Sequence, residues 1–236
     1  GRAPYETNYS GEPNGHMGQV ATQGGGSIFR PGKYYKALQC SFAATNLVAN
    51  PSFETNTTGW SAYGGASVSR SSLQALYGQY SMLAVTSGAT QGIQGSTSGA
   101  TASAQHMLSC WVYLEIARSV TIHATDGIDK DLGTTTVAVA AGVWTRIIHT
   151  FTTDTHTAIT YQVYANGATS MFVDAVQLEV GNVATPYCDG TLGSGHTWSG
   201  TAHASTSART AATLTYPVTG NINAAKGTLM MWLYAD

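Results

Sequence analysis

Short apolar runs of strand length recur along the middle of the chain, and this recurrence constrains the fold more than any other feature. Between residues 66 and 180 there are eight of them: ASVSR, YSMLAVTS, QHMLSCWVYLEI, SVTIHAT, TTTVAVA, WTRIIHTFT, AITYQVYA and SMFVDAVQLEV. Glycine, asparagine, aspartate and serine separate the runs, as tight turns require. This pattern predicts an all-β chain folded as an antiparallel β-sandwich rather than as βαβ units.

The third run shows which residues we expect in the core, because successive side chains of a strand point to opposite faces. One face is an apolar stripe: Leu108, Cys110, Val112 and Leu114. The other face is mixed: Ser109, Trp111, Tyr113 and Glu115. We interpret the first set as core and the second as a half-exposed recognition face.

The composition excludes several classes of function. Only 9% of the 236 residues are charged, the net charge is −2, and the ten Lys and Arg form no basic stripe, which argues against a nucleic-acid partner. No apolar run approaches the roughly 20 residues that cross a bilayer. The chain lacks the G-x-S-x-G, H-E-x-x-H and Cys–His patterns of common hydrolases, and its carboxylates suggest no glycosidase pair. We therefore predict a protein that is not an enzyme.

Changes in residue composition and apolar patterning divide the chain into four segments. Residues 1–45 are predicted to form an arm or the end of a preceding domain, and 46–180 the sandwich. Small and polar residues suggest a linker at 181–209, and 210–236 begins a second apolar segment that we interpret as the truncated start of another sandwich.

The three cysteines are Cys40, Cys110 and Cys188. We favour free thiols over a Cys40–Cys188 disulfide, because nothing else indicates an oxidising compartment.

Five motifs, in order, resemble carbohydrate-binding modules of families four and nine. They are NLVANPSFETNTTGW (46–60), ALYGQYSMLAVTSG (75–88), HMLSCWVYL (106–114), GVWTRIIHTFTT (142–153) and MFVDAVQLEVG (171–181). The resemblance covers about 135 residues of this chain and implies a jelly-roll β-sandwich that binds carbohydrate without catalysis.

A second resemblance concerns the setting. The stretch ATPYCDGTLGSGHTWSGTAHASTSAR (184–209) is similar to a junction in structural tail proteins of tailed bacteriophages. In those proteins a laminin-G/concanavalin-like sandwich often follows, and GTLMMWLYAD (227–236) resembles its opening.

The module resemblance also implies a structural calcium ion. The matching carboxylates are Glu54 and Asp174, with backbone carbonyls near 77–80 as a further contribution. Calcium takes six to eight oxygen ligands, so these residues would join the first and last strands of the sandwich. The alternative is that Glu54 forms local hydrogen bonds and Asp174 caps a turn.

Sugar recognition requires aromatic rings that stack on pyranose faces, together with amides that bind hydroxyls. We expect these from Trp111, Tyr113, Gln162, Tyr164 and Tyr63. Trp111 and Tyr113 are the preferred pair, unless a second sheet or a neighbouring subunit covers them. For Trp60 and Trp144 we favour packing.

Two other clusters of possible metal ligands lack the spacing of a known site. Asp126, Asp129 and Asp131 lack the spacing of an EF-hand, so we interpret their loop as a solvated turn, with a weak second calcium site as the alternative. His196 and His203 flank Trp198 without any other zinc-ligand signature, so we do not expect a zinc site there.

Taken together, these patterns predict a phage virion protein of the tail fibre, tail tip or surface decoration, assembled in the host cytoplasm and extracellular in the virion. Its sandwich would bind a host-surface glycan, as an adhesin, or adjacent subunits as a purely architectural part. A homo-oligomer is expected, with a trimer favoured. The alternative is an accessory carbohydrate-binding module of a secreted polysaccharide-degrading enzyme.

Overall fold

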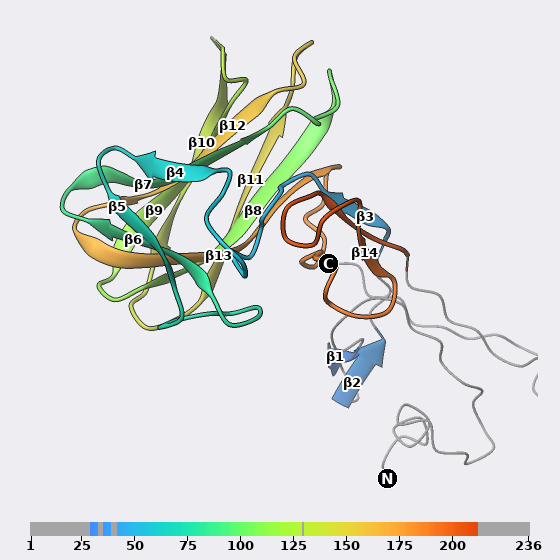
Figure 1. Cartoon of the computed structure of the whole chain (residues 1–236), viewed down its shortest axis with the longest axis horizontal. Coiled ribbons are helices and arrows are strands. Elements are labelled where there is room, and N and C mark those ends of the chain that lie inside the picture. Colours follow the sequence, from blue (N-terminus) through green and yellow to red (C-terminus); the bar gives the residue numbers. More distant parts are fainter. Residues whose placement is uncertain (1–28, 33–34, 39–41, 129, 212–236) are drawn as a thin grey trace, which may run out of the picture. The chain divides into compact units, whose positions relative to one another are not determined.

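The computed structural model describes residues 29–32, 35–38, 42–128 and 130–211 (Figure 1). These ranges contain strands, turns and bends but no helix, so none of them holds a helix able to cross a bilayer. The predicted start of a second sandwich, Cys40 and most of the predicted N-terminal arm lie outside the described residues.

The chain divides into two compact units, and nearly all described strands belong to the larger one, which contains residues 41–211. In the smaller unit the described residues form one antiparallel hairpin, in which β1 (Phe29–Gly32) pairs with β2 (Tyr35–Leu38).

The larger unit is a sandwich of two five-stranded antiparallel sheets (Figure 1). The first, here called the β12 sheet, has the order β10 (Asp131–Val139), β9 (Arg118–Thr125), β12 (Ile159–Asn166), β7 (Ala89–Thr97) and β4 (Trp60–Tyr63). The second, the β13 sheet, has the order β11 (Thr145–Thr152), β8 (Gln105–Leu114), β13 (Thr169–Val180), β6 (Ser81–Thr86) and β5 (Ser67–Ser71). The predicted all-β sandwich is confirmed, and each of the eight apolar runs contributes a strand.

The core lies between the sheets and follows the predicted alternation. Four residues of β8 are fully buried: Leu108, Cys110, Val112 and Leu114. The facing β12 sheet contributes Ile122, Tyr161 and Val163 to the same cluster. Because alternate side chains of a strand point the same way, the other residues of these strands lie on the outward faces.

Trp60 has the packing role favoured from the sequence. Its ring meets Phe53 edge-on at 5.1 Å and Tyr161 at 5.4 Å, and its Nε1 donates to the Asn50 carbonyl at 3.0 Å. Gly95 lies opposite Trp60, where a Cβ would stand 2.7 Å from the Tyr161 ring. This glycine therefore gives the two rings room to meet.

A β-bulge between Asp174 and Gln177 interrupts β13, with Ala175 at a positive φ of 51°. The extra residue changes which side chains face inward. Before the bulge the inward residues are Met171 and Val173, and after it they are Val176 and Leu178. Asp174 faces outward by alternation with Val173, and the bulge that follows it keeps Val176 and Leu178 in the core.

The stretch predicted as a linker contains two strands of a three-stranded sheet. Here β14 (His196–Trp198) pairs with β15 (Ser207–Arg209), which pairs with β3 (Ala44–Asn46). The buried Asn46 amide donates to the Val176 carbonyl at 2.9 Å and to the Cys188 carbonyl at 3.3 Å. The segment after β13 is thus fastened to the sandwich. Cys188 and Cys110 are both free and buried.

Two buried histidines make the sandwich sensitive to acid. Burial lowers the pKa of both His106 and His149 below the ordinary value of 6.5. The His149 ring nitrogens lie 3.1 Å from Thr135 Oγ1 and 3.2 Å from the Leu132 carbonyl. Burial favours the neutral ring, because a charged imidazolium would lose its hydration in the interior.

We expect the contribution of His106 and His149 to the free energy of unfolding to fall as the pH drops below about 6.5, because these histidines then bind more protons in the unfolded chain than in the folded one. The carboxyl of Asp174, whose pKa burial raises to about 7, acts in the opposite direction. Each histidine contributes a slope of at most about 1.4 kcal/mol per pH unit. Urea unfolding across this range should show a flatter dependence for His149→Gln than for the wild type. Identical slopes would contradict the prediction.

Candidate functional site

The outward face of the β12 sheet carries two rows of side chains that cross its strands. Strand register places Tyr63, Gly92, Tyr164, Thr121 and Thr136 side by side in the first row. The second row runs parallel to it: Ser61, Gln94, Gln162, His123 and Thr134. Tyr161 and Val163 point into the core, so Gln162 and Tyr164 must point outward.

The first row holds a pair of half-buried tyrosines. The Tyr63 and Tyr164 rings lie 5.5 Å apart and are tilted by 37°. Their strands are separated by β7, which puts the two backbones about 10 Å apart at the usual strand spacing. Between them in the register lies Gly92, where a Cβ would stand 2.0 Å from the Val163 carbonyl oxygen. Two phenol rings with polar tips thus share one sheet face.

The second row contains two hydrogen-bonded groups of polar side chains. Gln94 Nε2 donates to Ser61 Oγ at 3.1 Å. The His123 ring joins two partners, with Nδ1 at 2.7 Å from Gln162 Oε1 and Nε2 at 2.9 Å from Asp131 Oδ1. A hydrogen bond from the Gly133 N–H, followed by that from His123, holds the pKa of Asp131 below its usual range, so this exposed group is a carboxylate at neutral pH.

The Glu54 and Asp174 carboxylates both face the loop 76–80. Asp174 Oδ2 accepts the N–H groups of Leu76 at 2.8 Å and Tyr77 at 2.9 Å. Glu54 accepts those of Gln79 and Tyr80, at 3.0 Å and 2.9 Å. Burial raises the pKa of Asp174 to about 7, and the nearby Glu54 charge acts in the same direction.

The family comparison decides what kind of domain carries these features. A family model described as "Carbohydrate binding domain" (CBM_4_9) matches residues 45–171, more than half of the chain. The chain belongs to the CBM_4_9 carbohydrate-binding domain family. No curated protein matches it.

Solved structures agree with the fold of this CBM_4_9 domain. The CBM22-1 xylan-binding domain of Paenibacillus barcinonensis Xyn10C superposes with a TM-score of 0.50 at 20% identity, over 61% of this chain and 99% of that one. The tandem CBM22-1–CBM22-2 structure of Xyn10C gives 0.51 at 20% identity, over 61% and 48%. The CBM22-1–GH10 modules of Clostridium thermocellum Xyn10B, complexed with xylohexaose, give 0.50 at 17% identity, over 61% and 30%. At these identities the likeness concerns the fold.

The residues predicted from the sequence to bind sugar fall on opposite faces of the CBM_4_9 domain. Tyr63, Gln162 and Tyr164 lie together on the β12 sheet. Trp111 and Tyr113 belong to β8 in the β13 sheet. The five residues therefore do not form one site.

The predicted pair on the β13 sheet is engaged within the domain itself. Tyr113 packs against the rings of Trp144 at 5.7 Å and Phe172 at 5.9 Å, which also gives Trp144 the packing role expected for it. Trp111 lies between Arg146 and Asp174 in the strand register.

Two polar residues beside the tyrosines of the CBM_4_9 domain, Gln94 and His123, were not predicted from the sequence. Strand β7 was not predicted, so Gln94 was missed with it. His123 lies in the predicted run SVTIHAT, where strict alternation with the buried Ile122 and Ala124 marks it as outward-facing. That alternation is the signal that would have placed His123 beside Gln162.

Proposed function

We propose that this domain binds a glycan chain across the outward face of the β12 sheet. The observation that carries the proposal is the Tyr63–Tyr164 ring pair beside a connected row of amide, imidazole and carboxylate groups. Membership of a carbohydrate-binding family supports it. The proposed role is non-catalytic binding.

The two rows would contribute different contacts to the glycan, ring stacking from the first and hydrogen bonds from the second. The tyrosine rings offer apolar faces on which a pyranose ring can stack. Gln94, Gln162 and Asp131 offer donors and acceptors to sugar hydroxyls. Hydrogen bonds with Ser61 for Gln94, and with His123 for Gln162 and Asp131, fix their orientation. Because the two rows of side chains cross all the strands of the sheet, this face could bind the middle of a glycan chain as well as its end.

A panel of immobilised polysaccharides tests this proposal. Xylan belongs in the panel because a protein of similar fold was solved with xylohexaose. Bacterial cell-surface polysaccharides belong in it because a phage protein would meet them on its host. Binding of the domain to at least one member, competed by the soluble glycan, is the expected result. Absence of binding across the panel would refute the proposal.

We further propose that the domain is part of a phage virion, in the tail fibre, tail tip or surface decoration, where it attaches to a host-surface glycan. The support is the resemblance of residues 184–209 to phage tail-protein junctions. Assembly with other virion subunits and a homotrimer belong to this proposal, as do assembly in the host cytoplasm and an extracellular place in the virion. The second candidate is an accessory module of a secreted polysaccharide-degrading enzyme, supported by the same family membership.

The full-length gene and its neighbours distinguish the two settings. Flanking tail-assembly genes and a trimer in light scattering are expected for the virion protein. A glycosidase domain in the same reading frame would overturn that setting in favour of the second candidate.

Glu54 and Asp174 are also proposed to hold a structural calcium ion. Asp174 is fully buried, a second carboxylate lies nearby, and neither forms an ion pair within the described part of the chain. Such a pair of hard oxygen ligands fits a calcium ion, which would supply the missing positive charge. The alternative of local hydrogen bonding is the arrangement that the structure displays.

Chelation of calcium is expected to lower the Tm by roughly 5–10 °C. This follows because saturation at about 100 Kd contributes about 2.7 kcal/mol, and each kcal/mol shifts the Tm of a domain of this size by about 2–4 °C. Calorimetry should show one site in the wild type and none in Asp174→Asn. An unchanged Tm with no heat of binding would remove the site.

A further inference from the structure

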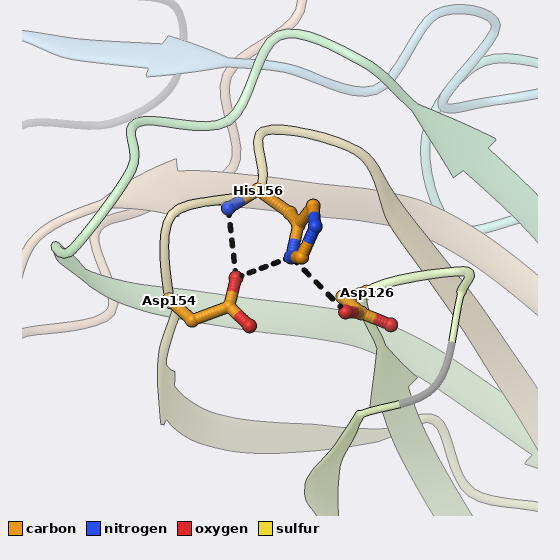
Figure 2. Close-up of side chains that lie close together, drawn as sticks. All are labelled: Asp126, Asp154 and His156. Atoms are coloured by element: carbon orange, nitrogen blue, oxygen red, sulfur yellow. Dashed lines mark hydrogen bonds and ion pairs between the residues drawn. The ribbon is translucent and has the colours of Figure 1, made fainter.

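A cluster of three side chains at one end of the sandwich has no part in glycan binding as proposed above. Asp126 lies in the loop between β9 and β10, whereas Asp154 and His156 lie in the loop between β11 and β12 (Figure 2). The second loop is itself tied to the loop before β8, since the Ala100 N–H donates to the Thr157 carbonyl at 3.0 Å. The cluster therefore joins two loops that are far apart in the sequence.

The donor atoms of the three side chains converge on one point. His156 Nδ1 is 2.9 Å from Asp154 Oδ1 and 3.3 Å from Asp126 Oδ2, so it stands between two carboxylates (Figure 2). One ligand atom from each residue lies within 4.8 Å of the others. Ligands of a single metal ion at about 2.0–2.2 Å each must lie this close together.

Backbone hydrogen bonds hold the two carboxylates in place. Asp126 is 1% exposed, and its Oδ1 accepts the N–H groups of Ile128 at 2.9 Å and Lys130 at 3.0 Å, which turns Oδ2 toward His156. Asp154 Oδ1 accepts the His156 N–H at 2.7 Å. Outer hydrogen bonds of this kind orient metal ligands in proteins.

The charges of the cluster call for a cation between the carboxylates. A buried carboxylate close to a second one is costly unless positive charge compensates it. The Lys130 ammonium is half exposed and lies 3.8 Å from Asp154 Oδ2, on the side away from the Asp154 oxygen that faces His156. A metal ion at the point of convergence, bound by His156 Nδ1 and one oxygen of each carboxylate, would supply positive charge between them.

We propose that a divalent transition-metal ion, represented by Zn²⁺, binds between Asp126, Asp154 and His156 and fastens the two loops together. An imidazole nitrogen with two carboxylate oxygens suits Zn²⁺, whereas Ca²⁺ takes oxygen ligands only. Binding displaces the proton from His156 Nδ1 to solvent, because only the neutral ring is a ligand. The ion leaves the Asp131–His123 contact of the glycan face untouched.

This site differs from the one considered in the sequence. There the alternative to a solvated turn grouped Asp126 with Asp129 and Asp131 for calcium. In the structure Asp131 pairs with His123, and Asp129 lies outside the described residues. The partners of Asp126 come from the other loop instead.

Titration of the metal-free full chain with Zn²⁺ at neutral pH tests the proposal. Calorimetry should give a site that His156→Ala and Asp154→Asn each weaken by roughly tenfold or more, since even outer-shell partners of a metal are worth about 10–100-fold. Both side chains are partly exposed, so the variants should fold, which circular dichroism checks. The matched control is Glu115→Gln, an exposed carboxylate after the opposite end of β8, which should bind as the wild type does.

Two results would overturn the proposal. One is the absence of Zn²⁺ binding by the wild type, which would leave the contacts of His156 Nδ1 with the two carboxylates as the whole role of the cluster. The other is Zn²⁺ binding that both variants retain at full strength, which would place the ion elsewhere, for example at the remaining histidines. Neither result bears on glycan binding, which is measured separately on the β12 sheet.

Discussion

Tyr164→Ala is expected to weaken glycan binding by roughly 30-fold or more, because a central aromatic anchor of a binding face contributes about 2 kcal/mol or more. Tyr164 shares the outward face of the β12 sheet with Tyr63, and each ring supports the position of the other at 5.5 Å. Tyr63→Ala should therefore show a loss of similar size. Affinity electrophoresis through the glycan identified in the panel measures both.

Trp111→Ala is the informative control, since Trp111 is an aromatic residue of similar exposure on the other sheet. It should bind the glycan as the wild type does. If Trp111→Ala abolished binding and Tyr164→Ala did not, the site would lie on the β13 sheet, as the sequence alone suggested.

Trp60→Ala is expected to lower the free energy of unfolding by about 3–5 kcal/mol, the usual cost of removing a large aromatic side chain from a core. The variant loses the ring contacts with Phe53 and Tyr161 and leaves the Asn50 carbonyl without its donor. Urea unfolding measures the loss, with Leu73→Ala as control. Leu73 is 73% exposed, so its removal should change stability by less than about 0.5 kcal/mol. Equal, small effects of the two substitutions would contradict the packing role of Trp60.

The strands with apolar runs were predictable because their inward residues must be hydrophobic. Strand β7 was not predicted because its packing requires small residues where the other strands have large apolar ones. Its sequence, ATQGIQGST, contains one large aliphatic residue, Ile93, which is fully buried. Gly95 leaves room for the Trp60 and Tyr161 rings, and Gly92 lets β7 lie close to the Val163 carbonyl oxygen of β12. A strand selected for space between neighbours carries little β propensity of its own.

The sequence predicts which side chains of the candidate site point outward, but not which of them lie on the same sheet. Alternation shows that Tyr113 and Tyr164 both point outward, yet it does not say which sheet holds which strand. That depends on pairing between strands distant in sequence: β8 lies between β11 and β13, whereas β12 lies between β9 and β7. The same reason hid the cluster of Asp126 with His156, which requires two loops to meet at one end of the sandwich.

The central claim is that glycan binds the outward face of the β12 sheet, and NMR titration of the isotopically labelled protein with the matching oligosaccharide tests it most directly. We expect the largest changes in chemical shift at Tyr63, Gln94, His123, Gln162 and Tyr164. Changes concentrated instead at Trp111, Tyr113 and their neighbours on the β13 sheet would contradict it.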